Sequence, residues 1–282
     1  MTGALDGWRV LVPHAGEWGD RVSALLAEHG ATATVVPLIR FEPPEDLTGL
    51  DDAVRRLADG AYAWLVVTSG TTVGALAGRA AAVLGGSAED ALVRAVGATP
   101  VAAVGPGTAR ALDRHGVRVA LVPEGERSAS GLVAELPDAV VADPSRPASP
   151  GAGNRVLHPR SDLSDRTLST GLQARGWQVD DPVAYRTVTG APEEGLPDRS
   201  AAELREEVRS GAFQAVLFSS GSTVRGALDV VGAPPPGTVV ACIGPRTEQA
   251  ALDGGLTVHV LSRTASAEGL VEALARHAEE AR

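Results

Sequence analysis

The residue types best suited to chemistry lie in two short segments that combine hydroxyl side chains with glycine. The segment TSGTTVGAL (68–76) returns as SSGSTVRGAL (219–228), and each copy follows a short apolar run. Two further turns, GPGT (105–108) and GPRT (244–247), hold similar residues. Glycine lets backbone approach a ligand closely, and the free N–H groups of a helix's first turn attract anions. These turns therefore predict carboxylate or phosphate binding by uncharged donors.

Each turn taken alone also has a structural interpretation. Serine and threonine are common helix N-caps, and glycine is a common turn residue. Their repetition in two halves of the chain favours a shared ligand site.

The repeat extends beyond these turns and indicates a duplicated domain. VAAVGPGTARAL (101–112) returns as VACIGPRTEQAAL (240–252), ASGLVAEL (129–136) as AEGLVEAL (267–274), and RVLVP (9–13) as RVLHP (155–159). The matches keep their order at a spacing of roughly 150 residues, as in a repeat architecture.

The elements that position these turns alternate between strand and helix. The predicted strands, such as 64–67, 117–122 and 215–218, are short and continuously apolar, which is typical of a parallel sheet covered on both faces. We therefore expect two similar doubly wound α/β domains with a cleft between them. Ligands bind beyond the carboxyl ends of such strands. The segment 137–153, rich in Pro, Ser and Gly, is expected to be a surface link.

Composition excludes several classes of function. The net charge of −10 argues against non-specific nucleic-acid binding. The sequence has no lysine, which excludes a Schiff base, and one cysteine, which excludes an internal disulfide and a cysteine metal cluster. Without a signal-like or membrane-spanning segment, a cytoplasmic protein that does not bind membranes is expected.

Other catalytic patterns are weak or absent. The histidines lack metal-ligand spacing, and neither a G-x-S-x-G elbow nor a phosphate-binding P-loop occurs. GPGTAR with Glu124 partly matches a dinucleotide fingerprint, but Arg110 replaces its third small residue. Tyr62 is expected to pack in the core or at its edge. Tyr185 is either a phenol donor or an aromatic wedge between domains.

In their order, these segments resemble the uroporphyrinogen-III synthase family. The resemblance rests on RVLVP, VVTSGTTV, VAAVGPGTARAL, GLVAEL, VLHPRSD, GWQVDDPVAYRT, VLFSSGSTV and IGPRT, which span nearly the whole chain. It implies a discontinuous domain of residues 1–38 plus 187–282. An inserted domain would span 42–183, with extended linkers near 38–42 and 183–188.

The resemblance also implies an activity. A cofactor-independent lyase of heme and other tetrapyrrole biosynthesis would cyclise hydroxymethylbilane, a linear tetrapyrrole bearing many carboxylates, with inversion of its last pyrrole ring and release of water. Tyr185 matches a tyrosine that assists departure of the hydroxyl group. The turns and the resemblance together predict these substrate-binding residues: Thr68, Ser69, Gly70, Thr71, Gly105, Thr108, Arg160, Ser219, Ser220, Gly221, Ser222, Gly244, Arg246 and Thr247.

One loop departs from the family pattern. After the first strand the family often has a Thr-Arg-Pro-like segment, whereas this chain has VPHAGEWGD (12–20), so His14 and Glu17 replace the basic character. Three alternatives stay open: a related cyclase or lyase acting on another anion, a non-enzymatic two-domain anion-binding module, and a dinucleotide-dependent enzyme. The family resemblance further predicts a monomer, and handover from the preceding pathway enzyme is an open expectation.

Overall fold

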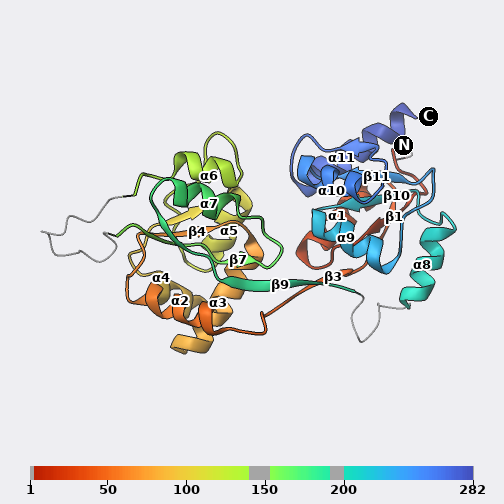
Figure 1. Ribbon diagram of the computed structural model, residues 1–282. Helices are drawn as coiled ribbons and strands as arrows, with labels where there is room; N and C mark the ends of the chain where they lie inside the picture. The colour runs from red at the N-terminus through yellow and green to blue at the C-terminus, as the bar shows by residue number, and fades with distance from the viewer. Residues whose placement is uncertain (1–2, 140–152, 191–199, 282) are drawn as a thin grey trace, which may run out of the picture. The chain divides into compact units, whose positions relative to one another are not determined.

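The computed structural model describes residues 3–139, 153–190 and 200–281. These residues divide into two compact units. The terminal unit comprises Met1–Arg40 and Val188–Arg282, and the middle unit comprises Phe41–Thr187 (Figure 1). Most of the link predicted at 137–153 lies outside the described residues.

The terminal unit is built on a parallel sheet. Its strands lie in the order β12 (Val260–Leu261), β11 (Val239–Cys242), β10 (Ala215–Phe218), β1 (Arg9–Val12) and β2 (Thr32–Val35), paired in parallel. Val10 and Val12 enter one core cluster, and Leu11 enters another. The strands are therefore buried on both faces, which explains their continuously apolar sequences.

Helices cover both faces of this sheet. Helices α1 (Glu17–Glu28) and α11 (Ala267–Glu280) supply Val22, Leu26 and Leu270 to one cluster. Residues of α8 (Ala201–Arg209), α9 (Gly221–Val230) and α10 (Pro245–Asp253) pack in the other.

The middle unit repeats the same plan. Its parallel strands lie in the order β5 (Val101–Ala103), β4 (Trp64–Val67), β6 (Arg155–Leu157) and β8 (Gln178–Asp180). One face is covered by α2 (Thr48–Ala58), α3 (Gly70–Leu84), α4 (Ala88–Val96) and α5 (Pro106–Arg114). The other carries α6 (Ala129–Glu135) and α7 (Thr167–Ala174), as Figure 1 shows.

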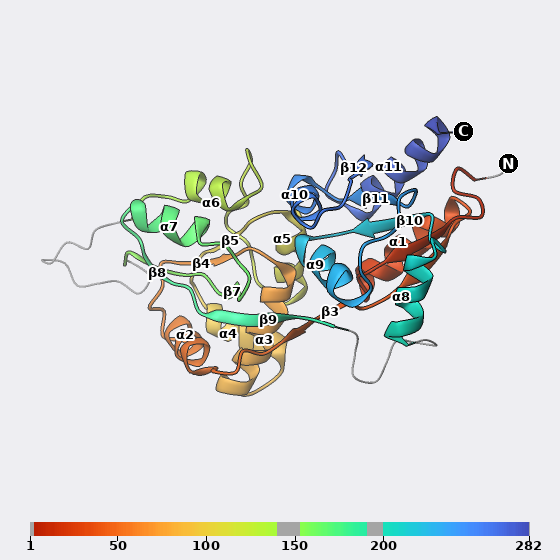
Figure 2. The same cartoon turned by 45° about the vertical axis from the view of Figure 1, so that its right-hand side comes forward.

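Two extended strands carry the chain between the units. The division falls within β3 (Ile39–Glu42) and within β9 (Val183–Thr189). In a separate small sheet, β9 lies between β3 and β7 (Arg160–Ser161), and Figure 2 shows β3 and β9 as neighbours.

The predicted fold class is confirmed, since both sheets are parallel and have helices on each face. The strand predicted at 117–122 is the exception. Within the described residues it forms an isolated bridge of Leu121 with Ala102, too short a pairing for a regular strand. Among the described residues, each helix is too short or too polar to cross a membrane.

Candidate functional site

The main sheet of each unit has a position where the strand order reverses. In the terminal unit β1 leads to β2 on one side, and β10 leads to β11 on the other. In the middle unit β6 leads to β8, and β4 leads to β5. Open α/β sheets bind ligands beyond the carboxyl ends of the strands at such a position. The two hydroxyl-rich turns follow β4 and β10, so both lie there.

In the first turn, Ser69 is the N-cap of α3. Its Oγ accepts a hydrogen bond from the Thr72 backbone N–H at 3.1 Å and lies 2.8 Å from the Thr72 hydroxyl. The rest of the predicted turn, Thr68, Gly70 and Thr71, is at least partly exposed. The serine thus stabilises the helix start, and the backbone N–H groups of Gly70 and Thr71, in the first turn of α3, have no partner within the helix.

The structure brings Tyr185 to this turn. The Tyr185 hydroxyl lies 3.3 Å from Ser69 Oγ. Its ring packs edge-on against Phe41, with centroids 5.3 Å apart and an interplanar angle of 83°. Tyr185 lies on β9 and Phe41 on β3, so the two linking strands and α3 together fix the position of the phenol.

A cavity of about 380 Å³ lies beside Tyr185 within the middle unit. Phe41 and Leu47 line one part of it, and Gly74 and Gly78 of α3 line another. A Cβ atom built on either glycine meets nothing within 4 Å, so the helix surface is open here. The surface of this cavity is mainly apolar, which suits the face of a pyrrole ring better than a carboxylate.

In the second turn, Ser220 is the N-cap of α9 and forms a capping box. Its Oγ accepts from Thr223 N–H at 3.2 Å, and the Thr223 hydroxyl accepts from Ser220 N–H at 3.1 Å. Gly221 and Ser222 are partly exposed in the first turn of α9. Their backbone N–H groups correspond to those of Gly70 and Thr71 in the middle unit.

Sequence reasoning missed a contact of the adjacent Ser219. Its hydroxyl lies 2.6 Å from His14 Nδ1, and the His14 ring stacks on Trp18 with centroids 5.0 Å apart. Burial lowers the pKa of His14 below its ordinary value. The repeat could have indicated His14 as a site residue, because aligning RVLVP with RVLHP places His14 opposite Arg160, a predicted substrate-binding residue. The loop that departs from the family pattern therefore carries an imidazole held by two contacts.

The Gly-Pro turns begin two further helices. Gly105 and Gly244 are the N-caps of α5 and α10, and proline occupies the first helical position of each, where a missing N–H costs nothing. Thr108 and Thr247 are buried, with 6% and 4% of their surfaces exposed. Arg246 is exposed at the start of α10.

Arg160 lies on β7 within a network of charges. Its Nε is 3.7 Å from Asp181, and its Nη1 donates to the Ser161 carbonyl at 3.0 Å. Asp181 also pairs with Arg166 at 3.1 Å and accepts from the Ser169 hydroxyl at 2.8 Å. The predicted contact of Arg160 with substrate stays a prediction.

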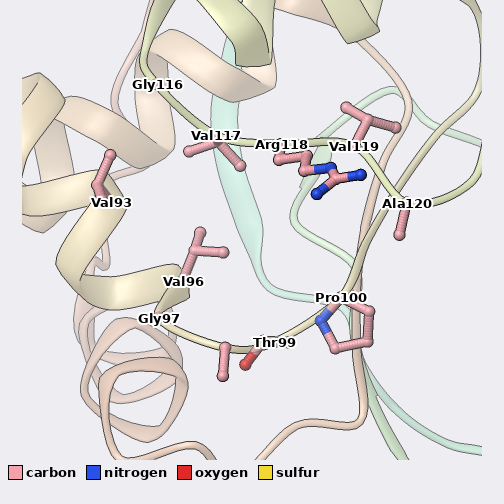
Figure 3. A pocket seen from close by; sticks show the side chains of 11 residues that line it. Val93, Val96, Gly97, Thr99, Pro100, Gly116, Val117, Arg118, Val119 and Ala120 are labelled. Atoms are coloured by element: carbon pink, nitrogen blue, oxygen red, sulfur yellow. The ribbon is translucent and has the colours of Figure 1, made fainter.

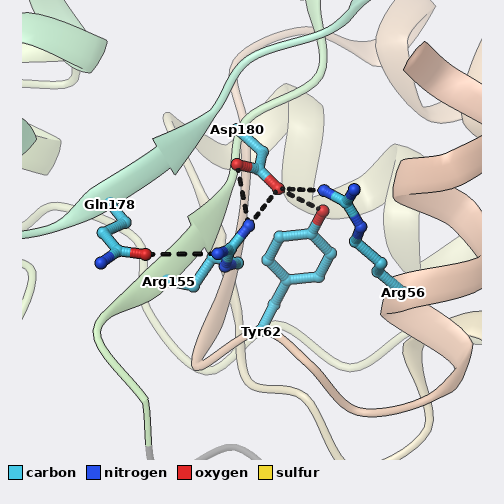
Figure 4. Close-up of polar contacts among 5 residues, drawn as sticks. All are labelled: Arg56, Tyr62, Arg155, Gln178 and Asp180. Atoms are coloured by element: carbon cyan, nitrogen blue, oxygen red, sulfur yellow. Dashed lines mark hydrogen bonds and ion pairs between the residues drawn. The ribbon is translucent and has the colours of Figure 1, made fainter.

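Tyr62 is confirmed as a core residue and belongs to a structural network. It is fully buried, and its hydroxyl donates to Asp180 Oδ2 at 2.8 Å. Arg56 and Arg155 reach the same carboxylate at 3.2 Å (Figure 4). Burial, followed by the bond to Asp180, raises the pKa of Tyr62 above its ordinary value. The Tyr62 hydroxyl therefore has a structural role.

A cavity of about 570 Å³ lies at the opposite end of the middle unit's sheet. It is lined by Val93 and Val96 of α4, by Thr99 and Pro100 before β5, and by residues 116–120, which include Arg118 (Figure 3). Because it adjoins the amino end of β5, it lies away from the predicted turns.

The donors at these turns are hydroxyls and backbone amides, with one phenol, one imidazole and the guanidinium of Arg246. Within the described ranges, no cluster of histidine, cysteine and acidic side chains could hold a metal ion. Within each unit, donors of these kinds can hold carboxylates, and the phenol or the imidazole can move a proton.

Comparison with known proteins gives a consistent result. A family model described as uroporphyrinogen-III synthase HemD matches residues 20–272. The uroporphyrinogen-III synthase of Synechococcus elongatus is 27% identical over 252 residues, which cover 86% of this chain and 85% of that protein. A putative uroporphyrinogen-III synthase of Methanothermobacter thermautotrophicus is 32% identical over 164 residues, covering 56% of this chain and 58% of that one.

Solved structures show the same fold. A mutant uroporphyrinogen III synthase from Thermus thermophilus aligns with a TM-score of 0.61 at 20% identity, covering 97% of this chain and all of that one. The Helicobacter pylori uroporphyrinogen-III synthetase aligns with a TM-score of 0.57 at 16% identity, covering 94% and 97%. With the family model spanning most of its length, the chain belongs to the uroporphyrinogen-III synthase family.

Proposed function

We propose that this protein is a uroporphyrinogen-III synthase that converts hydroxymethylbilane to uroporphyrinogen III and water. The observation that carries the proposal is the match of the family model over residues 20–272. The site chemistry supports it, because hydroxyl and amide donors at strand ends suit a substrate rich in carboxylates.

The reaction requires little covalent help from the protein. Loss of the terminal hydroxyl gives an azafulvene-like cation, which the substituted carbon of the last pyrrole attacks to form a spiro intermediate. Fragmentation and reclosure then invert that ring. The electron-rich pyrroles drive each step, so the protein contributes chiefly by holding the chain in a reactive orientation. The backbone N–H groups of Gly70, Thr71, Gly221 and Ser222 would hold its carboxylates.

Tyr185 would donate a proton to the departing hydroxyl, and its hydrogen bonds suit this role. Thr72 is 1% exposed, and its hydroxyl lies 2.8 Å from Ser69 Oγ. If Thr72 donates its hydroxyl hydrogen there, Ser69 Oγ accepts from both the backbone N–H and the hydroxyl of Thr72. The Ser69 hydrogen then points to Tyr185 Oη. The phenol hydrogen stays available for substrate, and Ser69 stabilises the negative charge that develops on the phenol oxygen.

An isomer analysis tests the proposal. Hydroxymethylbilane is generated in situ with and without this protein, and the products are oxidised and separated. We expect isomer III to predominate over the isomer I that forms spontaneously. An unchanged isomer ratio with folded protein would contradict the proposal and favour a related enzyme acting on another anion.

We further propose that the enzyme is a cytoplasmic monomer, an expectation supported by family membership. Sedimentation velocity over a range of concentrations should give the mass of a single 282-residue chain. A mass that doubles with concentration would contradict the monomer.

A further inference from the structure

A histidine–serine pair lies at the strand-order reversal of the terminal unit. Strands β1 and β10 are parallel neighbours there, with Leu11 opposite Val216. His14 follows β1 and Ser219 follows β10, and the two side chains meet at 2.6 Å between Nδ1 and Oγ. A base and a hydroxyl at this distance form the core of many proton-transferring sites.

Two contacts hold the imidazole ring, and a third holds its backbone. Its ring stacks on Trp18 at an interplanar angle of 20°, and Ser219 fixes Nδ1. The loop backbone packs against the first turn of α1, since a Cβ atom on Gly19 would lie 2.3 Å from the His14 carbonyl oxygen. A residue larger than glycine at position 19 would displace the loop. The ring therefore has a defined orientation, as proton transfer in a fixed geometry requires.

The ring is neutral near pH 7, because burial lowers the pKa of His14. The flanking helix α1 carries Glu17, Asp20, Arg21 and Glu28, of which Glu17 and Asp20 lie in its first turn, and α9 carries Arg225 and Asp229. When Nδ1–H donates to Ser219, the lone pair of Nε2 is available to accept a proton. Within the described part of the chain, His14 Nε2 has no hydrogen-bond partner, whereas Nδ1 contacts Ser219.

We propose that His14 is the base of the cyclisation and that its Nε2 accepts the proton released when the macrocycle closes. The proposal rests on the proposed function. Closure forms a carbon–carbon bond at the free α-carbon of the last pyrrole and leaves that ring cationic. The α-carbon–hydrogen bond then breaks, its electrons restore the aromatic pyrrole, and the proton passes to Nε2. The departing hydroxyl has taken up one proton, so the whole sequence loses one water without an oxidant or reductant.

Ser219 is a positioning residue in this scheme. In the tautomer that this scheme uses, its Oγ accepts from Nδ1–H and Nε2 is the basic nitrogen, and the same contact stabilises the imidazolium that forms. The imidazolium afterwards returns its proton to solvent.

A deuterium isotope effect separates this role from a structural one. The substrate carries deuterium at the free α-carbon of the last pyrrole, and kcat for isomer III is compared with the protium substrate. We expect His14→Gln to lower kcat by about 10²-fold, the lower end for loss of a general base. Its isotope effect should exceed that of the parent enzyme, because removal of the base makes breakage of this bond limiting. Ser219→Ala should lower kcat less, and Ser219→Thr should restore it.

His259→Gln is the matched control. His259 is an exposed histidine of the same unit whose Nδ1 accepts from Val240 N–H at 3.1 Å. This variant should keep the parent kcat and isotope effect. Circular dichroism establishes that each variant is folded.

The outcomes are distinct. An unchanged kcat in His14→Gln, or a lower kcat without a larger isotope effect, would overturn the assignment of His14 and leave the proposed function standing. If the parent protein makes no isomer III, the proposed function fails and this inference fails with it.

Discussion

The hydroxyl groups of Tyr185 and Ser69 lie 3.3 Å apart within one compact unit, although 116 residues separate them in the chain. Tyr185 comes from β9, which links the units, and Ser69 caps α3, the helix that follows β4. The contact joins the proposed proton donor to a turn proposed to hold substrate carboxylates, so proton transfer and binding share one hydrogen-bond network.

Substitution of Tyr185 and Ser69 should have coupled effects on turnover. Tyr185→Phe should lower kcat by about 10- to 100-fold without abolishing it, because orientation of the substrate supplies most of the rate enhancement. Ser69→Ala removes one hydrogen bond to the phenol and should lower kcat by about three- to tenfold. The measurement is kcat for isomer III in both single variants and the double variant.

The double variant should be no slower than Tyr185→Phe alone, because Ser69 is expected to act on turnover through the phenol. If the fold-losses in kcat of the two single variants multiply in the double variant, Ser69 contributes to turnover independently of Tyr185.

Tyr62 should resist ionisation in the folded protein. An unfolded tyrosine has a pKa of about 10, and burial together with the bond to Asp180 raises the pKa of Tyr62. A raised pKa in the folded state stabilises the protein below pH 10, and this contribution is lost as pH rises through the folded value. The chain has two tyrosines, so Tyr185→Phe leaves Tyr62 as the single phenol in an ultraviolet titration.

In that variant the phenolate band should appear well above pH 10. Adding Asp180→Asn should shift the band to lower pH but not fully to 10, since burial is the larger cause of the shift. A phenolate band near pH 10 in the folded variant would contradict the buried network of Figure 4.

Two glycines should respond to alanine in opposite directions. A Cβ atom on Gly226 of α9 would lie 2.7 Å from the Leu38 carbonyl oxygen and 2.7 Å from Ile39 Cγ2. Gly226→Ala should therefore lower the free energy of unfolding by about 1–3 kcal/mol, as overpacking does. Gly78 of α3 is exposed and has nothing within 4 Å, so Gly78→Ala should raise it by about 0.5–1 kcal/mol. Urea denaturation measures the free energy of unfolding of both variants. If the two substitutions changed this free energy in the same direction and by the same amount, that result would contradict the packing of α9 against the start of β3.

The sequence predicted those features that depend on local patterns. Apolar strands and repeated turns determine the parallel sheets, and the Ser69 and Ser220 caps follow from residue type at a strand–helix junction. The pairing of His14 with Ser219 spans 205 residues, so no local pattern contains it. The same holds for Arg160, whose partner Asp181 is set by the placement of β7. The sequence analysis therefore did not predict these contacts, because each depends on residues that the fold brings together from separate segments.

The ring of Phe41 should matter to catalysis through Tyr185. Phe41 is 44% exposed, unusual for a large apolar side chain, and its edge-on contact holds the Tyr185 ring from the side of β3. An aromatic pair of this kind contributes about 0.5–1.5 kcal/mol, so Phe41→Leu should lower kcat by about two- to tenfold if that energy orients the phenol. Leu252→Ala, at an apolar residue of α10 that is 50% exposed, is the control and should leave kcat unchanged. Phe41→Tyr should retain activity, because it keeps an aromatic edge at the same position. A parent-like kcat in Phe41→Leu would mean that Ser69 and the strand backbone suffice to orient Tyr185.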